Sequence, residues 1–294
     1  MTKPSHSTSQ AAGNGCIPHT ACVRSGVGDD TAHGAVMPPL YLSSNYTFEG
    51  FDQKRAYDYT RTGNPTRDAL GDALAELEGG AGAVVTASGM ASLTVICHLV
   101  KAGERIVAPH DCYGGTYRLL STLAERGHFE VDFADLTDPQ NRKAALAAGP
   151  RLVLVETPSN PLLRITDLAA VCAEARAVDA IVVADNTFLS PALQRPLDHG
   201  ADIVVHSTTK YLNGHSDVVG GALIARDADL AVVVACWANC LGVTGAPLAI
   251  YLTLRGARTL FPRLLQLCEL AAGIAALLDG HPAVRQVFFP GLES

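Results

Sequence analysis

Short apolar runs, rich in β-branched residues, recur along this chain, and stretches with helical patterns separate them. The runs cover residues 83–85, 105–107, 152–155, 181–183 and 203–205. They are apolar on both faces, as strands are when helices bury a parallel sheet from two sides. Between them, Pro65 opens a helical pattern that ends at Gly79-Gly80, and Asp167 precedes another that reaches Ala175. The alternation predicts an open, mostly parallel α/β sheet with helices on both faces, which binds its ligand at the carboxyl ends of the strands.

The strand pattern stops near residue 229. Three apolar helical stretches are expected after it, near residues 229–241, 246–256 and 259–279. The first 15 residues are polar and lack the apolar segment of a secretion signal, so we predict a disordered tail at 1–15 and a cytoplasmic protein. We divide the rest into an N-terminal extension (16–70), a large domain (71–258), and a linking helix with the start of a further domain (259–294).

Charge and composition narrow the function classes. Charged residues make up 17 % of the chain, against about 25 % in an average soluble protein, and hydrophobic residues make up 48 %. Much of the chain is therefore expected to lie inside a large fold or an oligomer. The net charge of −7 offers no basic field for nucleic acid or anionic lipid. Polar residues interrupt the uncharged stretch 83–100, so we predict a buried strand and helix there and no membrane span.

Lys210 is the most informative single residue. It is one of five lysines, and it follows both the run 203–205 and the hydroxyl triplet Ser207-Thr208-Thr209. A lysine at a strand end can form a Schiff base with an aldehyde cofactor while neighbouring hydroxyls bind a phosphate group. The alternative is a lysine that caps a loop, and from this residue alone the two interpretations are equally supported.

Two further strand ends carry groups that suit the same cofactor. Asp185 ends the run that begins at Ile181, so its carboxylate can pair with a protonated pyridine nitrogen. An Asx turn with Asn186 is the alternative. Ser88-Gly89-Met90 lies where a strand turns into a helix, so free backbone N–H groups can face a phosphate. The alternative there is an ordinary turn glycine.

Tyr113 and Asn160 add two more strand ends. The ring of Tyr113, after the strand that ends at Pro109, can lie on a planar cofactor, and Asn160 can hydrogen-bond a phenolic oxygen. A surface tyrosine is the alternative. Together the five strand ends supply a set of groups suited to pyridoxal phosphate (PLP). We expect no metal, because His206 and His215 lack the spacing of metal ligands.

Six segments together resemble the Cys/Met-metabolism family of PLP-dependent enzymes, and the resemblance covers nearly the whole chain after the tail. These segments are Tyr59–Thr66, Ser88–Met90, Asp111–Gly115, Glu156–Pro161, Asp185–Phe188 and Ser207–Asp217. Within the family, residues 108–113, 237–239 and 242–245 resemble the branch of bacterial cystathionine γ-synthases. The resemblance implies an α/β fold of the PLP-dependent transferase fold type I (aspartate-aminotransferase-like), with 71–258 as the PLP-binding domain.

The resemblance also implies the roles of the candidate residues. Lys210 would carry the cofactor and move protons, with help from Tyr113 as the stacking ring, and Asp185 would partner the pyridine nitrogen. The expected cofactor-binding residues are Lys210, Asp185, Ser207, Thr209, Gly89, Met90, Tyr113, Asn160, Tyr59 and Arg61. Of these, Tyr59 and Arg61 would reach the phosphate site of a neighbouring subunit. The expected assembly is therefore a homo-oligomer, a dimer of dimers, in which the 16–70 extension contacts the neighbour.

The activity that the resemblance implies is γ-replacement on small amino-acid substrates. An O-acylhomoserine, O-succinyl-L-homoserine in the first place, would react with L-cysteine to give cystathionine in methionine biosynthesis. A cystathionine or methionine γ-lyase and an O-acylhomoserine sulfhydrylase are the nearest alternatives, because the same lysine chemistry serves them. Family members continue for roughly another hundred residues as a small domain. That domain supplies the arginine for the substrate's α-carboxylate, so a non-catalytic PLP-binding remnant is the alternative from another class.

Overall fold

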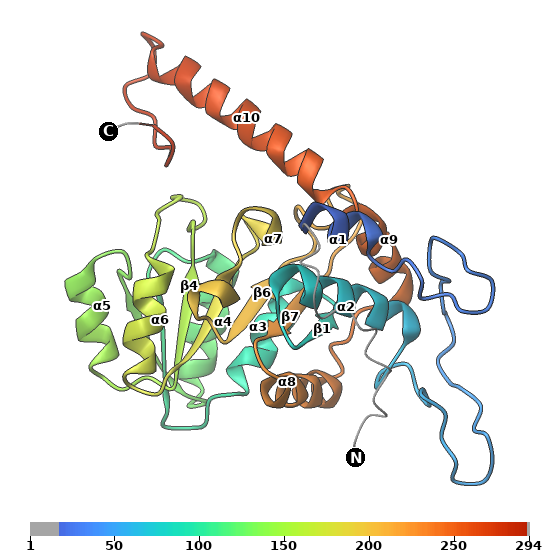
Figure 1. Cartoon of the computed structure of the whole chain (residues 1–294). Helices are drawn as coiled ribbons and strands as arrows, with labels where there is room; N and C mark the ends of the chain where they lie inside the picture. The colour runs from blue at the N-terminus through green and yellow to red at the C-terminus, as the bar shows by residue number, and fades with distance from the viewer. Residues whose placement is uncertain (1–17, 293–294) are drawn as a thin grey trace.

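The computed structural model describes residues 18–292, in which two layers of helices enclose a central sheet (Figure 1). The strands of this part are β1 (Gly82–Thr86), β2 (Arg105–Pro109), β3 (Glu130–Ala134), β4 (Leu152–Glu156), β5 (Ile181–Asp185), β6 (Ile203–His206) and β7 (Gly221–Ala225). Their spatial order is β1-β7-β6-β5-β4-β2-β3, with β7 antiparallel to both of its neighbours and the other pairs parallel. The predicted disordered tail, 1–15, lies outside the described residues.

The five predicted runs are strands β1, β2, β4, β5 and β6, and their side chains alternate between two buried clusters. Val107 and Val153 belong to one cluster, whereas Ile106 and Leu152 belong to the other. Each fully buried aliphatic side chain of this size contributes about 1.5–3 kcal/mol relative to exposure. The prediction of a mostly parallel α/β sheet with helices on both faces is confirmed.

Strands β3 and β7 are not among the runs that the sequence pattern predicts. β3 lies at one edge of the sheet, and its sequence Glu-Val-Asp-Phe-Ala alternates charged and apolar residues, which is a weaker signal than a continuous apolar run. β7 is fully buried, but Gly-Ala-Leu-Ile-Ala begins with glycine and contains two alanines, both weak strand formers. Its strand conformation therefore depends on pairing with β1 and β6.

One face of the sheet packs against α2, α5, α6 and α9, and the other packs against α3, α4 and α8. The helices of the described part are α1 (Pro18–Arg24), α2 (Pro65–Glu78), α3 (Gly89–Cys97), α4 (Gly114–Glu125), α5 (Pro139–Leu146), α6 (Leu168–Arg176), α7 (Ser190–Leu193), η1 (Pro196–His199), α8 (Ala228–Leu241), α9 (Pro247–Ala257) and α10 (Leu260–Asp279). Because α3 and α4 follow β1 and β2 directly, their N-termini lie at the carboxyl edge of the sheet.

The predicted helix signals act as expected. The side chain of Asn64 accepts hydrogen bonds from two backbone N–H groups of the first turn of α2, and Gly79 ends this helix with a φ of 78°. The carboxylate of Asp167 accepts the N–H of Ala170 at 3.0 Å and so caps α6. The three apolar stretches after residue 229 are α8, α9 and α10.

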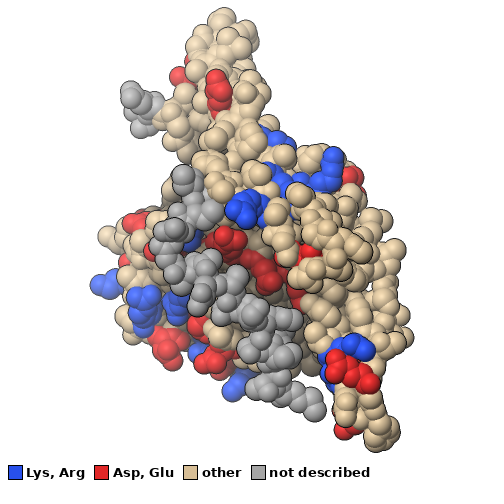
Figure 2. All heavy atoms as spheres, turned by 45° about the vertical axis from the view of Figure 1, so that its right-hand side comes forward, with Lys and Arg blue, Asp and Glu red and all other residues tan. Residues whose placement is uncertain are grey.

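Helix α10 projects from the rest of the molecule (Figure 1) and carries an apolar surface. Leu265, Leu270, Ile274 and Leu277 are each more than half exposed, and the projecting part is mostly uncharged in Figure 2 apart from acidic side chains near its end. Of the described helices, α10 is long and apolar enough to cross a membrane, with 22 % of its most apolar window buried. Membrane spans and helices that cover another protein surface share these properties, so this is weak evidence for a membrane.

One predicted domain boundary falls between two helices, and the other falls inside a helix. Residue 258 lies between α9 and α10, whereas residue 70 lies inside α2. Helix α2 packs on β1 and α9, so the second half of the proposed extension is continuous with the packed body of the large domain. The division stays a prediction.

Candidate functional site

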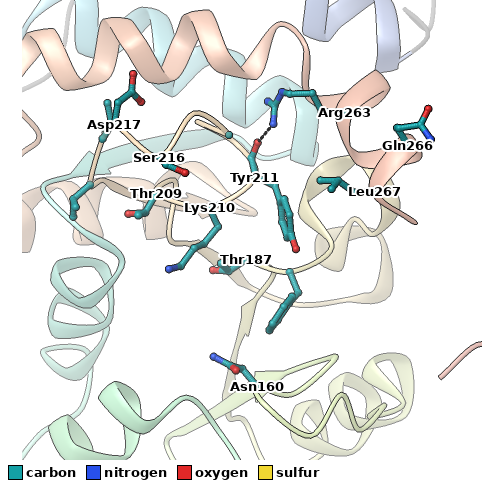
Figure 3. A pocket seen from close by; sticks show the side chains of 14 residues that line it. Asn160, Thr187, Thr209, Lys210, Tyr211, Ser216, Asp217, Arg263, Gln266 and Leu267 are labelled. Carbon is teal, nitrogen blue, oxygen red and sulfur yellow. Dashed lines mark hydrogen bonds between the residues drawn. The ribbon is translucent and has the colours of Figure 1, made fainter. Parts of the chain in front are cut away.

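A cavity of about 260 Å³ lies at the carboxyl ends of the parallel strands. A larger cavity of about 1030 Å³ shares one wall with it, and Figure 3 shows this larger space. Eight of the ten predicted cofactor-binding residues line the smaller cavity: Gly89, Met90, Tyr113, Asn160, Asp185, Ser207, Thr209 and Lys210. The other two, Tyr59 and Arg61, do not line it. Residues from five strand ends thus meet at one edge of the sheet, where the strand alternation places a ligand.

Lys210 reaches the cavity from the loop after β6. The backbone of this loop is a tight turn, in which the Lys210 N–H donates to the Ser207 carbonyl at 3.3 Å and the Gly214 N–H donates to the Lys210 carbonyl at 2.8 Å. Figure 3 shows the Lys210 side chain extending into the cavity beside Thr187, with Asn160 on the opposite wall. An exposed amine in a pocket is accessible to an aldehyde, as nucleophilic catalysis by lysine requires.

Asp185 ends β5 at the floor of the same cavity. Its Oδ1 accepts the N–H of Thr187 at 3.0 Å, so the Asx-type turn that we considered as an alternative is present, and the carboxylate still lines the cavity. Burial raises the pKa of Asp185, although the bond from Thr187 acts in the opposite direction. Within residues 18–292 it forms no ion pair. A half-buried carboxylate of this kind, at the wall of a cavity, is suited to a cationic ligand group.

The N-terminus of α3 lies against the start of the Lys210 loop. The Ser88 hydroxyl caps this helix by accepting the N–H of Ala91 at 3.0 Å, which orients the remaining N–H groups of the first turn toward the cavity edge. A Cβ atom on Gly89 would come within 2.8 Å of the Ser207 Cβ. Only glycine therefore allows the helix to approach the loop this closely, so Gly89 is more than an ordinary turn glycine.

We expect Gly89→Ala to separate α3 from the Lys210 loop. Overpacking at a fixed contact costs about 1–3 kcal/mol, so the free energy of unfolding should fall by that amount and PLP should bind more weakly. Gly273→Ala is the matched control, because a Cβ at Gly273 in α10 meets nothing within 4 Å. Urea unfolding and a PLP titration followed by absorbance measure both effects. Equal behaviour of the two variants would contradict the close-approach role of Gly89.

Two hydroxyls near this helix terminus are held by the backbone. The Thr187 hydroxyl oxygen accepts the Ser207 N–H at 2.8 Å and so joins the loops after β5 and β6. The Thr209 hydroxyl donates to the Gly220 carbonyl at 3.2 Å and accepts the Gly220 N–H at 3.0 Å. The hydroxyl of Thr209 is therefore oriented toward β7 as well as lining the cavity. Thr187 is a cavity residue that the sequence analysis did not single out.

Glu156 is a second carboxylate in the cavity, and it is buried; its role was not predicted from the sequence. It ends β4 directly opposite Asp185 in the β4–β5 register. Its Oε2 accepts the N–H of Tyr113 at 2.9 Å, and its Oε1 accepts the N–H of Asn160 at 2.7 Å. Burial and the charge of Asp185 raise the pKa of Glu156 to about 7. The signal was available in the sequence, because Glu156 follows an apolar run in the same way as Asp185.

Tyr113 immediately precedes α4 and lines the cavity, and 46 % of its surface is exposed. Its ring is therefore available to a planar ligand, which agrees with the predicted stacking role rather than with a surface tyrosine away from the site. Asn160 follows β4 and faces the same space, as Figure 3 shows.

A fully buried pair lies next to Asp185 in the structure. His206 Nε2 is 2.7 Å from Glu78 Oε1, and the amide of Asn186 donates to the same oxygen at 3.0 Å. The charge of His206 also lowers the pKa of Asp185, against the larger effect of burial. Among residues 18–292 no group of three or more His, Cys, Asp and Glu side chains could hold a metal ion.

Arg263 holds the Lys210 loop from the start of α10. Its guanidinium donates to the carbonyls of Tyr211 at 2.9 Å, the contact drawn in Figure 3, and Gly256 at 2.8 Å. A Cβ on Gly214 would lie 1.8 Å from the Arg263 guanidinium, so the loop and α10 are in close contact. The apolar pattern of residues 259–279 predicts α10, but it does not predict this link to the Lys210 loop.

Tyr59 and Arg61 lie away from the cavity of their own chain. The Arg61 guanidinium donates to the backbone carbonyl of Asn239 at 2.7 Å and to its side-chain oxygen at 2.9 Å. Tyr59 is exposed, as are Leu42, Phe48 and Phe51 in the preceding loop. Large apolar side chains exposed together in this way favour a surface that another protein chain covers.

Comparison with known proteins agrees with this arrangement. The family model described as Cys/Met metabolism PLP-dependent enzyme matches residues 19–294. The chain is 55 % identical over 274 residues to the cystathionine γ-synthase of Escherichia coli (strain K12). This alignment covers 93 % of this chain and 71 % of the relative. It is 40 % identical over 273 residues to a cystathionine β-lyase of Lactococcus lactis subsp. cremoris, covering 93 % and 72 %.

A solved structure shares the fold across the same region. The chain superimposes on the cystathionine γ-synthase of Xanthomonas oryzae pv. oryzae, crystallised in complex with aminoacrylate and cysteine, with a TM-score of 0.93 and 60 % sequence identity. That match covers 95 % of this chain and 72 % of the solved one. The residues gathered at the cavity, the matching family model and these relatives agree, and the chain belongs to the Cys/Met metabolism family of PLP-dependent enzymes.

Proposed function

We propose that the cavity at the carboxyl ends of β4, β5 and β6 binds PLP and that the chain catalyses γ-replacement on an O-acylhomoserine. The observation that carries the proposal is that Lys210, Asp185 and Tyr113, which come from three different strand ends, line one cavity. Their amine, carboxylate and aromatic ring are the three kinds of group that the aldehyde, the ring nitrogen and the ring face of PLP need.

The described residues fit PLP at both of its charged ends. Asp185 is a half-buried carboxylate without an ion pair in the described part, so a protonated ring nitrogen would supply the missing positive charge. At the other end, Gly89 leaves the first turn of α3 open beside Ser207, and helix N-termini bind phosphate groups through their N–H groups. Both features belong to the cavity walls and do not depend on the similarity to relatives.

Bound PLP supplies an aldehyde for attachment to an amine and a ring that withdraws electrons from bonds next to the substrate's α-carbon. Lys210 would hold the aldehyde and, with its amine free, would move protons at the α- and β-carbons of the substrate, with Tyr113 as a second proton carrier. Asp185 would keep the ring nitrogen protonated. Asn160 would donate to the phenolic oxygen, and Ser207, Thr209 and the backbone of Gly89 and Met90 would bind the phosphate.

The reaction assignment is supported by two cystathionine γ-synthases, which share 55 % and 60 % of their aligned residues with this chain. Other synthases, at 41 % and 43 %, are about as similar to the chain as a cystathionine β-lyase at 40 %, so the support comes from these two relatives. We therefore propose O-succinyl-L-homoserine and L-cysteine as substrates and cystathionine as the product. A γ-lyase and a sulfhydrylase remain the alternatives.

Product analysis separates these activities. The PLP-saturated chain is expected to convert O-succinyl-L-homoserine to cystathionine and succinate when cysteine is present. Production of 2-oxobutyrate and ammonia from cystathionine would instead identify a γ-lyase, and homocysteine formed from added sulfide would identify a sulfhydrylase. If PLP is bound but no substrate is turned over, the non-catalytic alternative is supported and the proposed reaction is wrong.

We further propose that Tyr59 and Arg61 complete the phosphate site of a neighbouring copy in a dimer of dimers. This is supported by the exposure of Tyr59 and of apolar side chains in the preceding loop, and by the finding that neither residue lines the cavity of its own chain. This proposal also includes a cytoplasmic location. Its partners are small amino-acid substrates and further copies of the chain.

A further inference from the structure

Glu156 occupies a position from which one side chain controls two loops of the cavity. It is 5 % exposed and lies at the end of β4, a central strand of the sheet. One carboxylate oxygen accepts the Tyr113 N–H from the β2–α4 loop, and the other accepts the Asn160 N–H from the β4–α6 loop. Both bonds are short, at 2.9 and 2.7 Å, and both acceptor oxygens belong to a charged group when Glu156 is ionised.

Other hydrogen bonds hold the two loops, such as the one from the Ser159 N–H to the Arg164 carbonyl at 3.0 Å, but Glu156 is the group that accepts the N–H groups of both Tyr113 and Asn160. Tyr113 begins α4 without a side-chain cap on the helix. A separate bond between the Ser159 hydroxyl and the Asp111 carboxylate, at 2.6 Å, joins the same loops farther from the cavity. Glu156 therefore joins the two loops at the wall of the cavity. From the end of β4 it binds the backbone of Tyr113, whose ring faces the cavity, and the backbone of Asn160, whose side-chain amide faces the same cavity.

We infer that Glu156 is a positioning residue that sets the Tyr113 ring and the Asn160 side chain at the cofactor by holding their backbone N–H groups. This inference rests on the proposed PLP site, because it assigns Tyr113 and Asn160 to that cofactor. Glu156 need not touch the reacting atoms. Its side chain is long enough to reach both loops from the end of β4, and its carboxylate has one acceptor oxygen for each loop.

The same carboxylate lies among other acidic groups. Asp185 faces it from β5, and Asp111 also raises its pKa, whereas the two backbone N–H bonds lower it. The nearby Cys112 thiol has a pKa raised to about 12 by burial and by Glu156 and Asp111, so it stays neutral at ordinary pH. With a pKa of about 7, Glu156 is ionised above neutral pH and protonated below it. Protection of the two amides should therefore weaken as pH falls through this range.

Glu156→Gln tests the span directly. Glutamine keeps the length but has one acceptor oxygen, so its NH₂ group must face one of the two N–H donors. Amide hydrogen exchange, corrected for the intrinsic pH dependence, is expected to be roughly ten- to hundredfold faster at Tyr113, Asn160 or both. The visible circular dichroism of bound PLP is expected to weaken because the ring above it is less fixed. Glu174→Gln, at a carboxylate paired with Arg142 between α6 and α5, is the matched control and should change neither signal.

Glu156→Asp separates positioning from charge. Aspartate keeps the negative charge beside Asp185 but is one methylene shorter, so it cannot span both loops. We expect it to loosen both amides as Glu156→Gln does. If Glu156→Asp restores parental exchange and circular dichroism, Glu156 acts through its charge and the positioning role is wrong. Unchanged exchange in Glu156→Gln would overturn the inference as well.

The measurements also distinguish this inference from the proposed function. Amide exchange is measured in the full chain both with and without PLP, so it reports on Glu156 even if the chain binds no cofactor. PLP binding is measured separately by its absorbance. If either variant fails to fold, the parent chain still provides a test. Protonation of Glu156 replaces one acceptor oxygen with a hydroxyl, so protection at Tyr113, Asn160 or both should fall as pH decreases. Unchanged protection of both amides at a pH where Glu156 is shown to be protonated would contradict the inference.

Discussion

Lys210→Ala is expected to abolish covalent attachment of PLP and to reduce kcat/KM by roughly 100- to 10,000-fold or more. Loss of a positioned proton carrier alone accounts for a reduction in this range, and loss of the amine that binds the aldehyde adds to it. Lys210 is exposed at the cavity and belongs to a loop held by Ser207 and Gly214, so its truncation should leave the fold intact.

The matched control for this variant is Lys143→Ala. Lys143 is exposed on α5, away from the cavity residues, so its replacement removes the same charge and side-chain length without touching the site. It should bind PLP and turn over substrate like the parent. Absorbance of the bound cofactor, its resistance to dialysis and steady-state kinetics provide the comparison. A Lys210→Ala protein with parental colour and activity would contradict the proposed site.

Asp185→Asn is expected to lower the PLP-dependent activity but not the stability of the PLP-free chain. Removing one partner of a buried charge pair costs about 3–5 kcal/mol, so PLP-dependent turnover should fall by roughly 100- to 1,000-fold or more. In the PLP-free chain the result differs. The pKa of Asp185 is raised, so its ionised form destabilises the folded state once the pH exceeds the ordinary value of 3.8. Asparagine removes that charge and can still accept the Thr187 N–H.

We therefore expect the PLP-free Asp185→Asn chain to be as stable as the parent or more stable at neutral pH. Asp179→Asn is the matched control, because Asp179 is exposed and has a φ of 56°, a conformation that asparagine tolerates well. Urea unfolding of the PLP-free proteins and kcat/KM of the PLP-loaded proteins give the two readouts. A large loss of stability without PLP would show that Asp185 is a structural residue instead of a cofactor ligand.

The sequence pattern predicted the parts of the fold that have strong local signals. Runs such as 152–155 are apolar on both faces and become central strands, and Asn64 and Gly79 mark the ends of α2 as capping chemistry requires. β7 was beyond this reasoning because its Gly-Ala-Leu-Ile-Ala sequence has no marked strand preference, and its antiparallel pairing with β1 and β6 is a tertiary property.

The candidate site could also be predicted where its residues lie next to a strong local signal, the end of an apolar run. Residues that directly follow apolar runs, such as Asp185 and Tyr113, reach the sheet edge whatever the details of packing. Arg263 could not be found in this way, because its contact with the Tyr211 carbonyl joins residues that are 52 positions apart in the sequence. Glu156 lay within reach of the strand-end argument, but its two backbone partners come from loops whose meeting only the structure shows.

The central claim is that the amine at position 210 holds the cofactor. The direct test is to saturate the purified chain with PLP, reduce it with borohydride so that the bound cofactor is fixed to its lysine, and map the modified residue by peptide mass spectrometry. The chain has four other lysines, at positions 3, 54, 101 and 143, which serve as internal controls. We expect one modified peptide, containing Lys210. Modification at any of the other four without Lys210 would contradict the proposed site.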